Sequence, residues 1–128
     1  LGDAWHDSKL GGTLTGVIDK TGDYHIEDRM IDIKGAGLFI RVGSGLSWLS
    51  WALGTKTIMI SGFSYPYTEF KDCIRVFNDN KDICTGCFNR HWLNPGDWDW
   101  CPIWKGTDKQ HICAKSISPL TVFNSLPI

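Results

Sequence analysis

The chain has 128 residues, with 13 basic and 14 acidic side chains that leave a formal net charge of −1. This length suits a single domain with one hydrophobic core. The basic residues are scattered and balanced by acidic ones, so the sequence shows no basic cluster of the kind that binds nucleic acid or an anionic membrane surface. No apolar run reaches the roughly 20 residues of a membrane-spanning helix. The amino end, LGDAWHDSKL, does not have the basic and apolar regions of a signal peptide. We therefore expect a cytoplasmic protein with neither nucleic acid nor membrane as a partner.

The amino-terminal third begins with irregular sequence and then becomes helical. A short strand is predicted at 14–18, before a turn at 21–22. Ile26, Met30 and Ile33 recur at helical spacing, with acidic residues early and a lysine late, as the helix dipole prefers. This pattern predicts an amphipathic helix over 26–36.

The middle of the chain alternates strands and helices. The apolar segment 38–42 is predicted as a buried strand, and a glycine turn then opens a short, very apolar helix that closes at Gly54. A second continuous apolar strand is predicted at 57–61. This order of helix, strand, glycine turn, helix and strand is typical of a parallel α/β sheet with both faces covered.

The last half of the chain is richer in loops. A final strand is predicted at 73–77. Ser118 and Pro119 have the residue types of a helix N-cap and first helical position, which predicts a closing helix over 120–125.

Between these elements, residues 82–113 hold four of the five cysteines and four of the seven tryptophans. Cys84 and Cys87 form a CxxC pair, whose spacing presents two sulfur atoms to one tetrahedral ion, and Gly86 relieves the crowded backbone between them. Cys101 and Cys113 complete a set of four thiol ligands. Four thiolates leave no open coordination position, so the predicted role is structural. The tryptophans of this stretch are then predicted to form a miniature core around the metal: Trp92, Trp98, Trp100 and Trp104.

Other interpretations of the cysteines remain open at this point. The long gap between the two halves of the motif leaves room for disulfides or for unlinked core cysteines. Zinc and iron both suit tetrahedral sulfur. His91 and His111 are alternative ligands, although surface imidazoles are favoured for both, and Cys73 is interpreted as a core residue of its strand.

The glycine turn at Gly43, Ser44 and Gly45 is a second candidate site. It joins a predicted strand to a helix, where unpaired backbone N–H groups and the positive end of the helix dipole converge. A phosphate fits such a position, which is also where open α/β sheets bind nucleotides. A tight turn without a ligand has the same pattern, so the signal is weak by itself. Trp48 and Trp51 share a helix face and are predicted to pack in the core.

The ordered segments GSGLSWLSWALG, IMISGFSYPYTEF, RVFND, CTGCFN, WDWCPIWKGT and HICAKSIS resemble the carboxyl-terminal half of bacterial autotransporter protein heptosyltransferases. These enzymes belong to the heptosyltransferase clan of GT-B glycosyltransferases. The resemblance covers about residues 38–118. In lipopolysaccharide heptosyltransferases the corresponding helix start reads Asp-Ser/Thr-Gly-Leu-Ser-His, and here Gly43 and Trp48 replace the acid and the histidine.

The resemblance implies an α/β fold, a partial Rossmann-like parallel sheet with an appended loop-rich four-cysteine metal finger. It divides the single domain into a nucleotide-sugar-binding part (1–72), the metal finger (73–117) and a closing helix with a tail (118–128). It implies a site for the donor diphosphate, a sugar contact and a metal site. The residues are Ser44, Gly45, Leu46 and Ser47 for the diphosphate, Glu69 for the sugar, and Cys84, Cys87, Cys101 and Cys113 for the metal, with iron favoured over zinc.

The implied function is sugar transfer from ADP-heptose, or a related nucleotide sugar, to serine hydroxyls of an autotransporter-like acceptor protein. The resemblance places the catalytic base in an amino-terminal half that this chain does not include, so we expect the 128-residue chain alone to be inactive. Full-length family members form large homo-oligomers. A metal-finger interaction module without transferase activity is the alternative, and nucleic-acid recognition by the cysteine module is disfavoured by the acidic balance.

Overall fold

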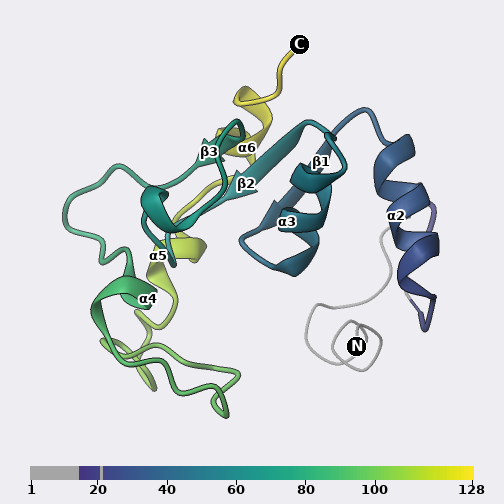
Figure 1. Cartoon of the computed structure of the whole chain (residues 1–128). Coiled ribbons are helices and arrows are strands. Elements are labelled where there is room, and N and C mark those ends of the chain that lie inside the picture. The colour runs from purple at the N-terminus through teal and green to yellow at the C-terminus, as the bar shows by residue number, and fades with distance from the viewer. Residues whose placement is uncertain (1–14, 21) are drawn as a thin grey trace.

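The computed structural model describes residues 15–20 and 22–128 and centres on a three-stranded parallel sheet (Figure 1). The strands are β1 (Phe39–Val42), β2 (Thr57–Ile60) and β3 (Ile74–Val76), in the order β1-β2-β3. The register pairs Phe39 with Thr57 and Ile58 with Ile74. Because neighbouring strands are parallel, each connection returns to the same end of the sheet, and α3 (Gly45–Ala52) makes the first crossover. The predicted α/β fold is confirmed.

The core of the sheet lies under β2. Ile58 and Met59 are 0% and 1% exposed, and Val76 of β3 is 3% exposed. The continuous apolar sequence of β2 predicted a buried strand, and the prediction is confirmed because β2 has a partner on each edge.

The helix α3 lies against the sheet through two serines rather than through its tryptophans. Ser47 and Ser50 are fully buried, and their hydroxyls make hydrogen bonds of 2.8 Å to the Val42 carbonyl and the Thr57 hydroxyl. These small, hydrogen-bonded side chains let the helix approach the strands closely. The prediction that Trp48 and Trp51 pack in the core is wrong, since the two residues are 45% and 43% exposed.

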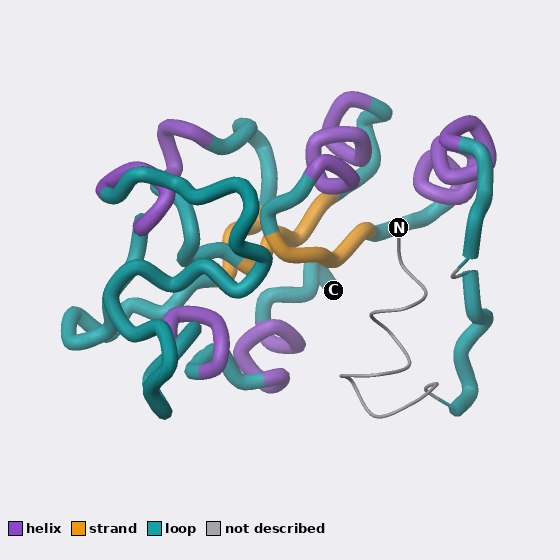
Figure 2. The backbone as a smooth tube through the Cα atoms, turned by 90° about the horizontal axis from the view of Figure 1, so that it is seen from below, coloured by secondary structure: helices purple, strands orange, loops and turns teal. Residues whose placement is uncertain are grey.

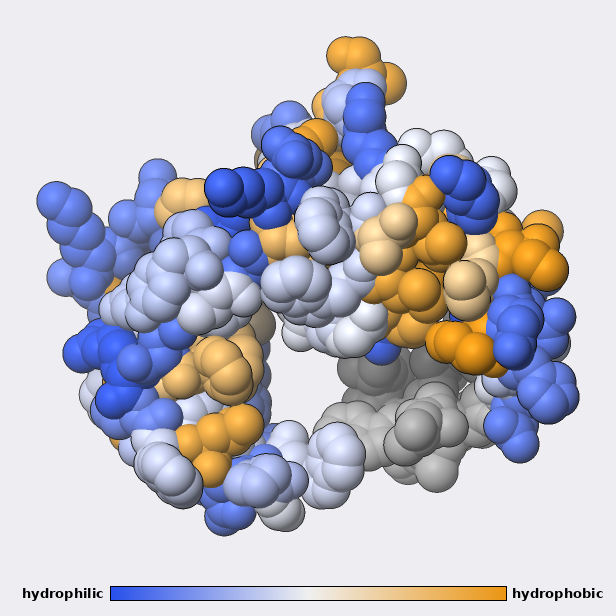
Figure 3. Space-filling view, in the orientation of Figure 1, coloured by the Kyte–Doolittle hydropathy of each residue, from blue (hydrophilic) through white to orange (hydrophobic). Residues whose placement is uncertain are grey.

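The amphipathic helix predicted at 26–36 forms as α2 (Ile26–Gly35), but only part of its apolar face is covered. Ile33 is buried, whereas Ile26 is 54% exposed. Two hydrogen bonds fix the end of α2 to the turn after α3, from Lys34 Nζ to the Leu53 carbonyl and from the Thr55 hydroxyl to the Ile33 carbonyl. The surface view shows the resulting hydrophobic patches on the side of α2 and α3 (Figure 3).

Two strand predictions need correction. The segment 38–42 forms β1, but Ile40 and Val42 are 44% and 51% exposed, so this strand is not buried. The reason is that β1 is an edge strand, paired only with β2 among the residues that the structure describes. The predicted strand at 14–18 does not form over 15–18, which makes a turn, and its first residue lies outside the described residues.

The rest of the chain folds into loops and short helices. These are the 3-10 helix η1 (Pro66–Thr68), α4 (Cys87–Arg90), α5 (Ile112–Lys115) and α6 (Pro119–Asn124). The strand predicted at 73–77 is β3, and the predicted cap of α6 is confirmed because the Ser118 hydroxyl accepts a hydrogen bond from the Thr121 N–H. Seen from below, helices lie on both sides of the three strands (Figure 2). Within the described part of the chain, every helix is too short or too polar to cross a membrane.

Candidate functional site

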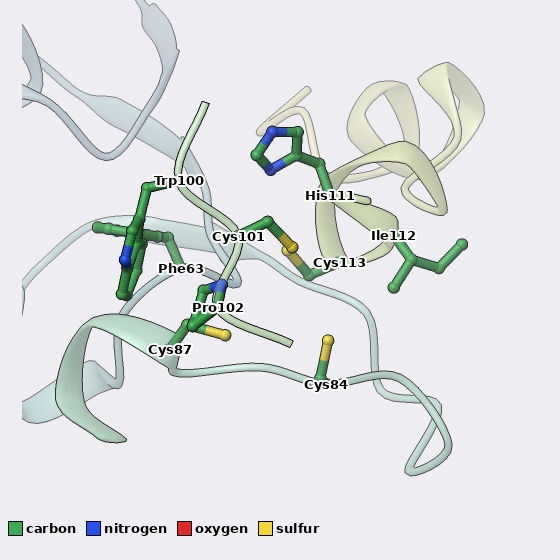
Figure 4. Close-up of a pocket in the computed structure, with 9 residues that line it drawn as sticks. All are labelled: Phe63, Cys84, Cys87, Trp100, Cys101, Pro102, His111, Ile112 and Cys113. Atoms are coloured by element: carbon green, nitrogen blue, oxygen red, sulfur yellow. The ribbon is translucent and has the colours of Figure 1, made fainter. Parts of the chain in front are cut away.

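Four cysteine side chains from separate segments line one small cavity (Figure 4). Cys84 precedes α4, Cys87 begins α4, Cys101 lies in the loop that follows, and Cys113 belongs to α5. Their sulfur atoms point toward the interior of the group. The cavity volume is about 20 Å³, which is room for one ion or one water molecule. The tertiary structure thus brings together all four cysteines that the sequence grouped.

Left-handed backbone conformations introduce both short helices of this region. Gly86 has a φ of 69° just before Cys87, and His111 has a φ of 58° just before α5. Glycine adopts this conformation without a steric cost, which confirms the role predicted for Gly86. The chain reverses sharply at these two points, and Cys87 and Cys113 follow the reversals within one or two residues.

The segment 62–65, which follows β2, attaches the cysteine region to the sheet. The carbonyls of Gly62 and Phe63 accept hydrogen bonds of 2.8 and 3.0 Å from the Gly86 and Phe88 N–H groups. The Tyr65 ring packs against Gly86 so closely that a β-carbon added there would lie 2.4 Å from it. Local sequence patterns do not predict these contacts, because they join residues that are distant along the chain.

The electrostatics of the cavity favour neutral thiols while no ion is bound. Burial, together with the neighbouring sulfurs of Cys84, Cys113 and Cys101, raises the pKa of Cys87 to about 11. Burial likewise raises the pKa of Cys113, with further contributions from Cys84 and Cys101. Ionised sulfurs at this site would repel one another, and a metal ion would remove that repulsion. In ligand type, the four thiols therefore fit a structural metal.

The detailed geometry does not by itself form a metal site. Among the described residues, no group of three or more His, Cys, Asp or Glu side chains is arranged so that it could hold a metal ion. All five cysteines are unlinked, so the disulfide alternative is not found, and Cys73 lies outside the cavity with its sulfur near the Phe70 carbonyl. His111 lines the cavity but pairs with the Asp99 carboxylate at 3.2 Å, and its ring points away from the sulfurs.

The four tryptophans of the region do not form the predicted miniature core. Trp100 lines the cavity and makes an edge contact with Phe63 at 5.6 Å between ring centroids. Trp92 and Trp98 are instead 94% and 82% exposed, so the prediction is wrong for these two. Their loop, residues 91–100, contains no helix or strand, and most of its residues are exposed.

The glycine turn leaves several donors without partners. The Ser44 hydroxyl is shielded from solvent and makes no hydrogen bond in the described structure. The Ser44 carbonyl accepts from the Ser47 and Trp48 N–H groups, so the N–H groups of Gly45 and Leu46 precede the first bonds of α3. A β-carbon added at Gly45 would meet open space. The turn therefore contains an unpaired hydroxyl and backbone N–H groups that precede the first helical bonds, which are the kinds of donor that an anion site uses.

Glu69 lies in a buried network rather than in a solvated loop. Its carboxylate is 5% exposed, pairs with Arg75 at 2.6 Å, and accepts hydrogen bonds from the Ser61 and Ser64 hydroxyls. Arg75 also donates to the Ser61 hydroxyl at 2.9 Å. The network fixes the loop at the carboxyl end of β2. Arg75 was not singled out from the sequence, because nothing in the strand pattern distinguishes it from a surface arginine.

Comparison with known proteins relates this architecture to glycosyltransferases, although no protein-family model matches the chain. The autotransporter heptosyltransferase BAHTCr of Citrobacter rodentium is 42% identical over 105 residues, which are 80% of this chain and 25% of that protein. The inactive autotransporter heptosyltransferase BimC of Burkholderia thailandensis is 39% identical over 88 residues, which are 67% of this chain and 20% of that protein.

A solved structure shows the same fold. The crystal structure of TibC from Escherichia coli, a dodecameric iron-containing heptosyltransferase in complex with ADP-D-beta-D-heptose, matches with a TM-score of 0.78 and 37% identity. The match covers 88% of this chain and 30% of TibC. The chain is thus homologous to a part of the autotransporter heptosyltransferases, as the sequence motifs implied. It spans about a quarter of the length of the curated relatives that it matches.

Proposed function

We propose that this chain is the donor-binding part of a glycosyltransferase that uses a nucleotide sugar, with ADP-heptose as the expected donor. The observation that carries the proposal is the glycine turn at the start of α3, within a stretch homologous to heptosyltransferases. Ser44, Gly45, Leu46 and Ser47 would hold the donor diphosphate. The unpartnered Ser44 hydroxyl supports this assignment, because a buried donor without an acceptor costs about 1–3 kcal/mol that a ligand oxygen would recover.

The chemistry follows from the charge that develops during transfer. As the bond between the sugar and the diphosphate breaks, the leaving diphosphate gains negative charge. The backbone N–H groups of Gly45 and Leu46 and the positive end of α3 are already fixed in place, so they stabilise this charge more strongly in the transition state than in the ground state.

The acceptor belongs to the proposal as well. We expect transfer to a serine hydroxyl of an autotransporter-like protein in the cytoplasm, by a full-length protein that assembles as a homo-oligomer. TibC, whose structure is dodecameric, supports the assembly. No residue of this chain is assigned as the base that deprotonates the serine. We therefore expect the 128-residue polypeptide to bind the donor without transferring the sugar.

The cysteine region, within residues 73–117, is proposed as a metal finger. Cys84, Cys87, Cys101 and Cys113 would hold one iron ion, with zinc as the alternative, and the iron-containing relative TibC supports iron. Four thiolates fill a tetrahedral sphere, so the ion would stabilise the loops around it. Residues 1–72 would then form the nucleotide-sugar-binding part, with a sugar contact near Glu69, and residues 118–128 would close the domain.

Calorimetric titration with ADP tests the donor site. We expect saturable ADP binding by the reduced, metal-loaded protein, and loss of that binding in Ser44→Tyr, because the bulky phenol would replace the hydroxyl assigned to the diphosphate. Lys56→Tyr is the matched control, since it places the same bulk on an exposed residue just before β2, at the opposite end of the strands. Equal ADP binding by both variants would contradict the assignment.

A metal-finger interaction module is the second candidate function. The inactive relative BimC favours it, because a protein without transferase activity retains a stretch homologous to most of this chain. Folded, metal-loaded protein that binds no ADP at millimolar concentration would support this candidate over the first.

A further inference from the structure

A second and larger pocket lies between the ends of the strands and the cysteine region. Its volume is about 660 Å³, which is within the range of about 300–1,000 Å³ typical of ligand sites. Residues between 61 and 66, after β2, form one wall, and the continuous stretch 77–85, after β3, forms another. In Figure 1 this stretch runs from the end of β3 to α4, whose Arg90 also lines the pocket.

The pocket lies at the same end of the strands as the glycine turn. Because the three strands are parallel, their carboxyl ends lie together. The glycine turn follows β1, whereas the two walls of the pocket follow β2 and β3. Neighbouring strands are about 5 Å apart, so the pocket begins about 5–10 Å across the sheet from the turn. A sugar that is attached to a diphosphate at the turn is therefore within reach of a second substrate in the pocket.

The charges that line the pocket are balanced. Glu69 pairs with Arg75 at 2.6 Å, so the positive charge of this arginine is neutralised within the wall. Two acidic and two basic residues supply the other charges of the lining, and all four are exposed: Asp79, Lys81, Asp82 and Arg90. Because these signs cancel, the pocket has no strong net attraction for a phosphate group. It suits an uncharged ligand that both donates and accepts hydrogen bonds.

A polypeptide segment has this chemistry. Its backbone alternates N–H donors with carbonyl acceptors, which pair with carboxylate and guanidinium groups respectively. In the described part of the chain, the carboxylates of Asp79 and Asp82 make no hydrogen bond or ion pair, so both are available to accept. Tyr65 and Phe77 add aromatic side chains to the lining, and tyrosine, phenylalanine and arginine are enriched where proteins bind one another.

We propose that this pocket binds the acceptor polypeptide and holds an uncharged segment around its target serine beside the donor site. The inference rests on the proposed function, because it takes the diphosphate at the glycine turn and a protein as the acceptor. It also gives the cysteine region a part in substrate binding, since Cys84 lines both this pocket and the cavity of the four sulfurs.

Fluorescence polarisation of a short, fluorescein-labelled peptide of alternating serine and asparagine tests the proposal on the full, reduced chain. We expect saturable binding that ADP-heptose does not displace. Asp79→Trp should weaken peptide binding at least about tenfold, because the indole would occupy the pocket, and should leave ADP binding unchanged. Asp82→Ala removes one acceptor without adding bulk and should weaken peptide binding about two- to tenfold, the range of a single hydrogen bond.

Asp28→Trp is the matched control, since it makes the same substitution at an exposed residue of α2 that does not line the pocket. Its peptide affinity should stay within about twofold of the unmodified chain, a change of about 0.4 kcal/mol. Circular dichroism and the retained ADP affinity check that each variant is folded.

The outcomes separate this inference from the function on which it rests. A chain that binds ADP but not the peptide overturns only the acceptor pocket. Displacement of the peptide by ADP-heptose would assign the pocket to the donor, and peptide binding that survives Asp79→Trp would place the peptide elsewhere, so either result also overturns the inference. Peptide binding without ADP binding overturns the proposed function, and the role of the peptide as an acceptor falls with it.

Discussion

Gly86 joins the cysteine region to the sheet, and replacing it with alanine tests that connection quantitatively. Its φ of 69° is left-handed, a conformation that costs a residue with a β-carbon about 1–2 kcal/mol. The new β-carbon would also lie 2.4 Å from Tyr65 Cε1, well inside the normal contact of about 3.5–4.0 Å. Moving the ring away adds about 1–3 kcal/mol, typical of an overpacked contact. The expected loss of unfolding free energy is therefore about 2–5 kcal/mol.

Gly106→Ala is the matched control for this measurement. Gly106 also has a left-handed φ, 78°, but an added β-carbon there would meet nothing within 4 Å. This variant should lose only the backbone cost of about 1–2 kcal/mol. Urea denaturation of the reduced protein, followed by far-ultraviolet circular dichroism, gives both values. Equal losses in the two variants would show that the Tyr65 contact does not constrain the cysteine region.

Two further predictions concern the candidate site. Glu69→Gln should lower the free energy of unfolding by about 1–3 kcal/mol, because it leaves the largely buried Arg75 guanidinium without its carboxylate. In the same denaturation assay, Asp32→Asn removes the exposed partner of Lys20 and should cost less than about 0.5 kcal/mol. Similar losses in the two variants would show that burial of the Glu69–Arg75 pair has no effect on stability. Elemental analysis of protein purified under reducing conditions should find about one iron or zinc per chain, consistent with a four-thiolate site. That metal should be lost in Cys84→Ser and retained in Cys73→Ser, and metal-free, folded wild-type protein would contradict the finger.

Local sequence patterns predicted most of the elements around the site because their signals come from neighbouring residues. The apolar sequence of β2, the glycines around α3 and the Ser118 cap each act within a few residues, so a single sequence shows them. The CxxC spacing likewise pointed to Cys84 and Cys87 as one unit. Burial was predicted less well, since it depends on what packs against each element.

The two tryptophans of α3 show this difference. Their apolar character predicted burial, yet Ser47 and Ser50 occupy the buried face, because their hydroxyls find partners on the strands. Similarly, the apolar sequence of β1 predicted a buried strand, and its position at the edge of the described sheet leaves it exposed.

By itself the sequence determined the order of β1, β2 and β3 and of the helices α2, α3 and α6, the glycine turn before α3 and the cysteine set, because these depend on residue type and short spacing. Only the tertiary structure decided that Cys101 and Cys113 meet the CxxC pair, that Glu69 pairs with Arg75, and that the loop after β2 attaches the cysteine region to the sheet. These contacts join residues far apart in the chain. Their formation depends on the cooperative packing of whole segments, which short-range patterns do not encode.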